Sequence, residues 1–181
     1  MNIEELEGKE VTILNTQSTF VNIQTGTTIL KVNFKGKVEF HLIKNTSGTL
    51  LLSHKSPLLI DHNEPWIEVF INSRPSDPDL LLSNIKSTID AKTEGKRNWQ
   101  NYVTKDSNFR FENFLRNIKE GNGLLLYAPV SIAKEVELVC KSHGVLTKSF
   151  NYSEETDSKK LLSIGINYVI AKDFVISPGS A

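Results

Sequence analysis

The sequence is poor in the residues that usually build covalent or metal-based sites. Its 181 residues include one cysteine, one methionine and four histidines. The single thiol, Cys140, has no second cysteine with which to form an intrachain disulfide, so a disulfide scaffold is excluded. A reducing compartment is the simpler setting for such a chain. We therefore expect a cytoplasmic protein.

Charge of one sign is not in excess either. Lysine plus arginine and aspartate plus glutamate number 21 each. Proteins that bind nucleic acids or anionic membranes usually gather them with a long-range positive potential, which this balance removes. The sequence therefore disfavours a nucleic-acid partner, except through a local basic patch.

Long apolar runs are missing as well. The longest, residues 124–130, contains Tyr127 and Pro129, and it is far shorter than the roughly 20 residues that cross a bilayer. The beginning of the sequence is acidic and polar, without the basic stretch and apolar core of a secretory signal. We expect no membrane partner and no export.

The composition is otherwise that of a folded globular protein. Hydrophobic residues make up 39% and charged residues 23% of the chain, both close to ordinary usage, so disordered and fibrous classes are excluded. Fold class must then be read from the pattern along the chain.

Residues 1–73 are typical of a β-rich domain. Short stretches rich in β-branched and aromatic residues alternate with turn formers, and 30–34 and 38–42 show the two-residue period of half-buried strands. The Lys35–Gly36 pair between them predicts a hairpin. With no helical pattern between strands, this part is expected to form an antiparallel β barrel or sandwich-like structure.

Residues 74–181 show a different, α/β pattern after a proline-rich boundary at 73–78. Two amphipathic helices are predicted, at 78–94 and from Ser107 to Gly121. Strands at 123–128, 145–150 and 166–171 then alternate with a helix capped by Ser131 and a short helix ending near Gly165, which favours a βαβαβ unit. A final edge strand is expected at 174–177. The fold class is α+β.

No cofactor motif is present. A phosphate cradle needs glycines at a strand-to-helix junction, and the one suitable junction, 127–131, has none. Ser131 there is more simply a helix cap. We predict no cofactor.

Catalytic and metal-binding candidates are weak. Cys140 and His143 share a helical face, but neighbouring valines on that face make Cys140 a core residue rather than a nucleophile. The cluster of His54, Asp61, His62 and Glu64 follows no strong metal-ligand spacing, and such residues are common in loops. We predict no catalytic residue and no metal ligand, and the chain leans away from being an enzyme.

Residues 92–119 form the one local basic patch, with aromatic residues among its lysines and arginines. Cations beside aromatics can hold a nucleic-acid backbone and stack its bases, although ordinary solvated helix faces have the same mixture. The candidate binding residues of the chain are Lys96, Arg97, Trp99 and Tyr102 in this patch, with Tyr127 and Ser131 at the strand-to-helix junction.

These observations favour a non-enzymatic interaction or assembly protein that binds another protein or itself. A neutralising partner, of the kind an immunity protein is to a toxin, fits the size and the lack of catalytic motifs by analogy alone. The alternative is a small enzyme or ligand-binding protein with a pocket between the β-rich and α/β parts, lined by residues such as Tyr127, Ser131, Asn151 and Tyr152. A weaker alternative is nucleic-acid binding through 92–119.

Overall fold

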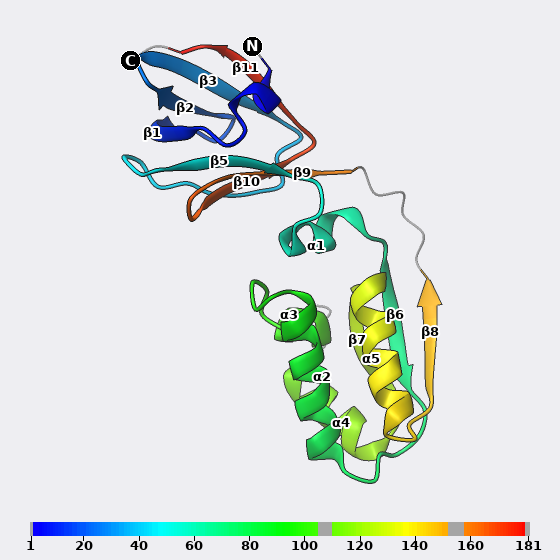
Figure 1. Cartoon of the computed structure of the whole chain (residues 1–181). Coiled ribbons are helices and arrows are strands. Elements are labelled where there is room, and N and C mark those ends of the chain that lie inside the picture. Colours follow the sequence, from blue (N-terminus) through cyan, green and yellow to red (C-terminus); the bar gives the residue numbers. More distant parts are fainter. Residues whose placement is uncertain (1, 105–109, 152–157, 180–181) are drawn as a thin grey trace. The chain divides into compact units, whose positions relative to one another are not determined.

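The computed structural model describes residues 2–104, 110–151 and 158–179 (Figure 1). Its internal contacts group the chain into two compact units. Unit 1 combines Met1–Leu59 with Asp157–Ala181, and unit 2 is the intervening segment Ile60–Thr156. The chain is mixed α+β, as the sequence predicted.

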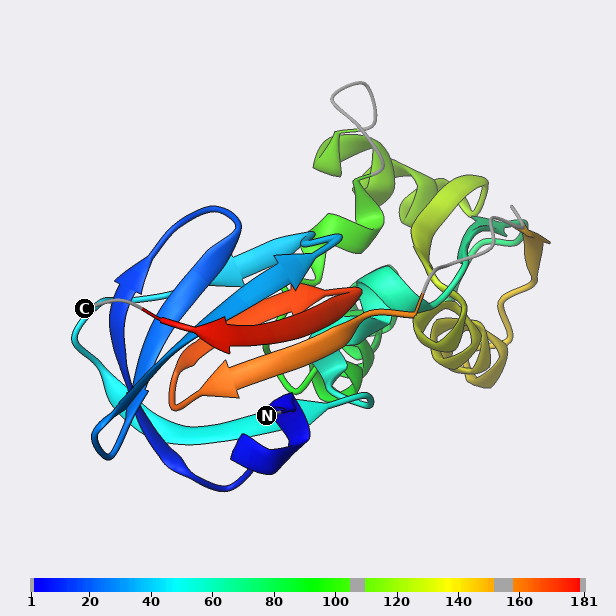
Figure 2. The same cartoon turned by 90° about the horizontal axis from the view of Figure 1, so that it is seen from above.

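Unit 1 is built on one antiparallel sheet with the strand order β11-β3-β2-β1-β5-β9-β10-β4. In Figure 2, strands from the first and last parts of the sequence lie side by side in this sheet. The short 3-10 helices η1 (Ile3–Leu6) and η2 (Pro57–Leu59) complete it. The strands are β1 (Glu10–Thr16), β2 (Phe20–Thr25), β3 (Thr28–Lys35), β4 (Glu39–His41), β5 (Ser47–Ser53), β9 (Lys160–Ile164), β10 (Asn167–Ala171) and β11 (Asp173–Pro178).

The antiparallel β-rich part is therefore confirmed, but the sheet does not form a closed barrel. The predicted hairpin at Lys35–Gly36 is wrong. Gly36 does adopt a left-handed φ of 59°, but β3 pairs with β2 and β11, whereas β4 leaves the turn to pair with β10. The two-residue period of 30–34 is confirmed, since Leu30, Val32 and Phe34 are buried in the unit 1 core.

Unit 2 is a three-stranded sheet with helices packed on one face (Figure 1). The strand order is β7-β6-β8, and both outer strands run antiparallel to the central β6. The segment β7-α5-β8 is thus a helical crossover between two parallel strands that have β6 between them. Its elements are α1 (Ile60–Asn63), β6 (Trp66–Ile71), α2 (Pro78–Lys92), α3 (Gln100–Val103), α4 (Phe111–Glu120), β7 (Gly123–Pro129), α5 (Val130–Ser142) and β8 (Thr147–Asn151).

Local signals explain where the unit 2 helices begin and end. The Asp77 side chain accepts a hydrogen bond from the Leu80 backbone at 2.9 Å, and Pro78 occupies the first position of α2. Gly121 ends α4 in the left-handed conformation, with a φ of 72°. None of the helices in the described parts of the chain is long and apolar enough to cross a membrane.

The core of unit 2 lies between the sheet and the helices. Ile67, Val69 and Ile71 project from alternate positions of β6 into a cluster that includes Ile85 and Phe114 from α2 and α4. The other face of β6 carries Glu68 and Phe70, with Phe150 of β8 packed edge-on against Phe70 at a ring separation of 5.6 Å. One face of this sheet is therefore covered by helices.

The βαβαβ detail is not confirmed. The third expected strand, β10, pairs with β9 and β4 in the unit 1 sheet, and Lys160–Ile164 forms strand β9 where the end of a short helix was expected. The predicted division after residue 73 also differs from the contact grouping. The physical reason is β6, which the sequence assigned to the β-rich part but which pairs with β7 and β8.

Candidate functional site

Three of the predicted binding residues come together in unit 2. Arg97, Tyr102 and Tyr127 lie around Trp66 and Asp61, which sequence reasoning had not chosen as binding residues. Asp61 comes from α1 and Trp66 begins β6, so the cluster ties the entrance of the sheet to α3 and the end of β7.

The Asp61 carboxylate is engaged through both of its oxygens. Its Oδ1 accepts a hydrogen bond from the Tyr102 hydroxyl at 2.7 Å. Its Oδ2 lies 3.1 Å from Arg97 Nε, an ion pair whose geometry falls short of a hydrogen bond. The side chains of Arg97 and Asp61 are only 14% and 18% exposed. A carboxylate held in this way anchors structure, and it has little capacity left for acid–base work on a substrate.

Tyr102 serves this cluster as a neutral hydrogen-bond donor. Its side chain is fully buried. Burial, followed by the hydrogen bond to Asp61, raises the pKa of the Tyr102 phenol far above its ordinary value. The phenolate is therefore not populated near neutral pH, which removes Tyr102 as a general base or nucleophile.

Trp66 forms the aromatic centre of the cluster. Its ring centroid lies 4.9 Å from that of Tyr127 and 5.8 Å from that of Tyr102. The indole Nε1 donates a hydrogen bond to the Asp61 backbone carbonyl at 3.0 Å. Any residue at position 61 would supply this backbone carbonyl, so the sequence carried no signal for the contact.

Ser131 lies in the first turn of α5, where its role differs from the predicted cap. Pro129 occupies the cap position, and the Ser131 backbone N–H donates to Glu64 Oε2 at 2.8 Å. A carboxylate of the chain itself thus occupies the positive end of this helix. The Ser131 hydroxyl oxygen is buried and has no hydrogen-bond partner among the described residues.

The remaining predicted residues belong to the basic patch. Lys96 pairs with Glu94 on the surface at 2.7 Å, and Lys92 lies 3.6 Å from Glu135. Trp99 packs edge-on against Phe111 and Phe114, with ring separations of 5.6 and 6.1 Å. Lys105, Asp106 and Phe109 of this patch lie outside the described residues, as does Tyr152. In the described part of the patch, Tyr102 is fully buried and Trp99 is partly buried against the unit 2 core.

Cys140 is a core residue of α5. It is fully buried, and burial raises the pKa of its thiol to about 12. His143, at the end of the same helix, instead exchanges a hydrogen bond with the Asn84 side chain at 2.9 Å. The thiol is thus protonated and enclosed near neutral pH, which does not suit a nucleophile.

Two of the metal-ligand candidates make contacts within the protein. Asp61 and Glu64 accept the hydrogen bonds described above. Within residues 2–104, 110–151 and 158–179, no group of three or more His, Cys, Asp or Glu side chains is placed to hold a metal ion.

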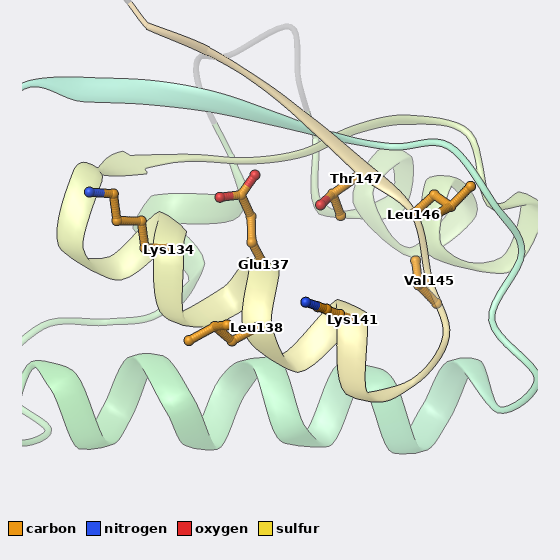
Figure 3. Close-up of a pocket in the computed structure, with 7 residues that line it drawn as sticks. All are labelled: Lys134, Glu137, Leu138, Lys141, Val145, Leu146 and Thr147. Atoms are coloured by element: carbon orange, nitrogen blue, oxygen red, sulfur yellow. The ribbon is translucent and has the colours of Figure 1, made fainter.

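One side of unit 2 is formed by α5 and the start of β8. A groove of about 530 Å³ lies there, and Figure 3 shows the side chains around it. Leu138 and Leu146 are 61% and 67% exposed. The groove is lined by Lys134, Glu137, Leu138 and Lys141 from α5 and by Val145, Leu146 and Thr147 at the start of β8.

The helical layer covers the two edges of the sheet unequally. Helices α3, α4 and α5 all pack against β7, whereas α5 is the main helix that reaches β8. Ser149 shows the result, because it shares a face with the buried Val69 and yet is exposed. Among the described residues, the β8 edge therefore has less helical cover than the β7 edge.

No protein-family model matches this chain, and neither a curated protein nor a solved structure does.

Proposed function

We propose that this chain is a non-enzymatic protein-interaction protein whose binding surface is the α5–β8 side of unit 2. The observation that carries the proposal is the groove there, with exposed Leu138 and Leu146 beside the outer strand of a sheet. Exposed apolar side chains gathered at one place are typical of interaction surfaces.

The Asp61 cluster supports a non-enzymatic reading. Its carboxylate is already paired, the Tyr102 phenol is held neutral and the Cys140 thiol is buried and protonated. In their observed state these groups support packing within unit 2 rather than acid–base or nucleophilic chemistry. A protein that neutralises a toxin is one kind of non-enzymatic interaction protein that this proposal includes.

Site-specific photo-crosslinking tests the proposal. A photo-reactive amino acid replaces Leu146 in one protein and Glu120 in a matched control, and each is irradiated in lysate of the source organism. Glu120 is exposed at the end of α4, which packs against the opposite edge strand β7. We expect a discrete protein adduct from position 146 and none from position 120. Equal labelling at both positions, or no adduct at 146, would contradict the proposed surface.

A further inference from the structure

We infer that the α5–β8 groove binds an extended, acidic and apolar segment of another protein, which adds to β8 as a fourth strand of the unit 2 sheet. This inference rests on the proposed function and names the chemistry of the partner. Three observations carry it: the direction of the β8 backbone groups, the position of the groove and the charges that line it.

The backbone of β8 offers hydrogen bonds on its outer side. The Leu146 carbonyl accepts from the Asn72 N–H at 2.8 Å, and the Leu146 N–H donates to Ser73 Oγ at 2.7 Å. The backbone N–H and C=O of Leu146 therefore point toward the β6 side. Antiparallel pairing alternates strictly, and the β6–β8 register is continuous. The N–H and C=O groups of Thr147 and Ser149 therefore point away from β6, toward the open edge.

The groove lies beside this same edge. A strand that adds to β8 would place every second side chain on the helical face of the sheet, next to Leu138. A strand edge bordered by a helix is a recognised way to bind an extended peptide, in which backbone bonds supply affinity and alternate side chains supply specificity. The exposed Leu138 then gives the partner's apolar side chains a contact surface on this face.

The charges favour an acidic partner. The groove lining holds two lysines, Lys134 and Lys141, against Glu137. Neither lysine has an ion-pair partner in the described ranges of the chain. Carboxylates at intervals along a bound strand would complement these cations.

The test uses the full chain and a displayed library of random peptides of about 10 residues, roughly the upper length of a natural strand. Selected peptides should combine acidic with apolar residues in alternation. Ser149→Pro removes one outward N–H without removing a bond to β6, and proline is tolerated at such edge positions. We expect it to weaken binding about fivefold to tenfold, whereas Ser149→Ala, which keeps the N–H, leaves binding unchanged.

A second measurement does not depend on altering the protein. Single N-methyl groups are placed at successive residues of one selected peptide. Strand addition predicts a two-residue period, in which methylation at alternate positions abolishes binding and methylation between them does not. The double variant Lys134→Glu/Lys141→Glu should weaken binding of the same peptide about tenfold or more. Uniform N-methyl effects together with an unaffected Ser149→Pro variant would overturn strand addition.

The outcomes separate this inference from the proposed function. Binding that is lost in Leu138→Asp but insensitive to Ser149→Pro and to N-methylation would keep the surface and reject strand addition. If Leu138→Asp weakens the binding of no selected peptide and position 146 gives no adduct, both the proposed surface and strand addition are rejected. Light scattering could instead detect a dimer that Ser149→Pro dissociates. That result would assign the β8 edge to a second copy of this chain and would reject the proposal that another protein binds there.

Discussion

Removal of the Asp61 carboxylate should destabilise unit 2 far more than removal of a surface ion pair. In Asp61→Ala, the Arg97 guanidinium and the Tyr102 hydroxyl, both largely buried, lose their shared partner. Breaking a buried charge pair costs about 3 to 5 kcal/mol. Residual access of water to Asp61 and Arg97 places the expected loss near the lower end, at about 3 kcal/mol. Lys96→Ala, which breaks an exposed pair with Glu94, should cost less than about 1 kcal/mol.

Tryptophan fluorescence measures this effect in unit 2 alone. The sequence has two tryptophans, and both, Trp66 and Trp99, belong to the segment Ile60–Thr156. Urea slopes of about 1 to 3 kcal/mol/M are typical of units of this size, so a loss of about 3 kcal/mol moves the midpoint by roughly 1 to 3 M. Each variant is normalised to its own folded and unfolded signals, because Trp66 contacts Tyr102 directly.

A double-mutant cycle then tests whether Asp61 and Tyr102 act together. Tyr102→Phe alone should cost about 1.5 to 3 kcal/mol, the usual value for a hydrogen bond to a charged group. In the Asp61→Ala background the same change should cost much less, since its acceptor is already gone. Additive losses, or an Asp61→Ala midpoint no different from that of Lys96→Ala, would refute the view that this carboxylate anchors unit 2.

Three further predictions concern other parts of the chain. Gly121→Ala should destabilise unit 2 by about 2 to 5 kcal/mol for two reasons. The added methyl group would overlap the backbone of Arg74, and an alanine would have to adopt the left-handed φ of this position. Gly144→Ala, with a φ of 69° but open space around it, should cost only about 1 to 2 kcal/mol in the same urea assay. Cys140 should resist iodoacetamide until urea unfolds unit 2. Burial raises the pKa of this thiol from 9.0 to about 12. Between those pH values, the Cys140 thiol therefore ionises only in the unfolded chain. Stability should therefore fall as pH rises through that window, by up to about 1.4 kcal/mol per pH unit, and less in Cys140→Ala. A hydrogen bond from Lys160 lowers the pKa of Asp173, so Lys160→Met should move that pKa upward in a carboxyl-detected NMR titration, and an unchanged pKa would contradict the contact.

Local pattern was sufficient for the elements whose neighbours are close in sequence. The stripe of Leu81, Ile85 and Ile89 with the Asp77 cap predicted α2, and the alternation of Leu30, Val32 and Phe34 predicted β3. Pairing between distant strands was not available from such patterns. Nothing local shows to which sheet β6 belongs, because its apolar face fits either sheet equally well.

The candidate sites show the same division. Sequence reasoning selected Arg97, Tyr102 and Tyr127 for their residue types. In the structure, Arg97 pairs with Asp61 and the two tyrosines pack against Trp66. It missed the α5–β8 groove because, in the sequence, the exposed Leu138 cannot be told from a leucine on the buried face of an amphipathic helix. Leu138 becomes informative only when β8 is known to be an outer strand, which depends on the fold.

The division of unit 1 between two stretches of sequence has a consequence for synthesis on the ribosome. Leu162, Val169 and Phe174 complete the unit 1 core, and β9 is the strand that pairs with the second half of β5. Strands β1 to β5 therefore emerge long before their last partners, whereas all of unit 2 is contiguous and emerges in between. Vectorial folding should complete unit 2 first, and until residues 160–178 are made, β3 and β5 present unpaired edges. Nascent chains stalled before β9 should accordingly depend most on chaperones.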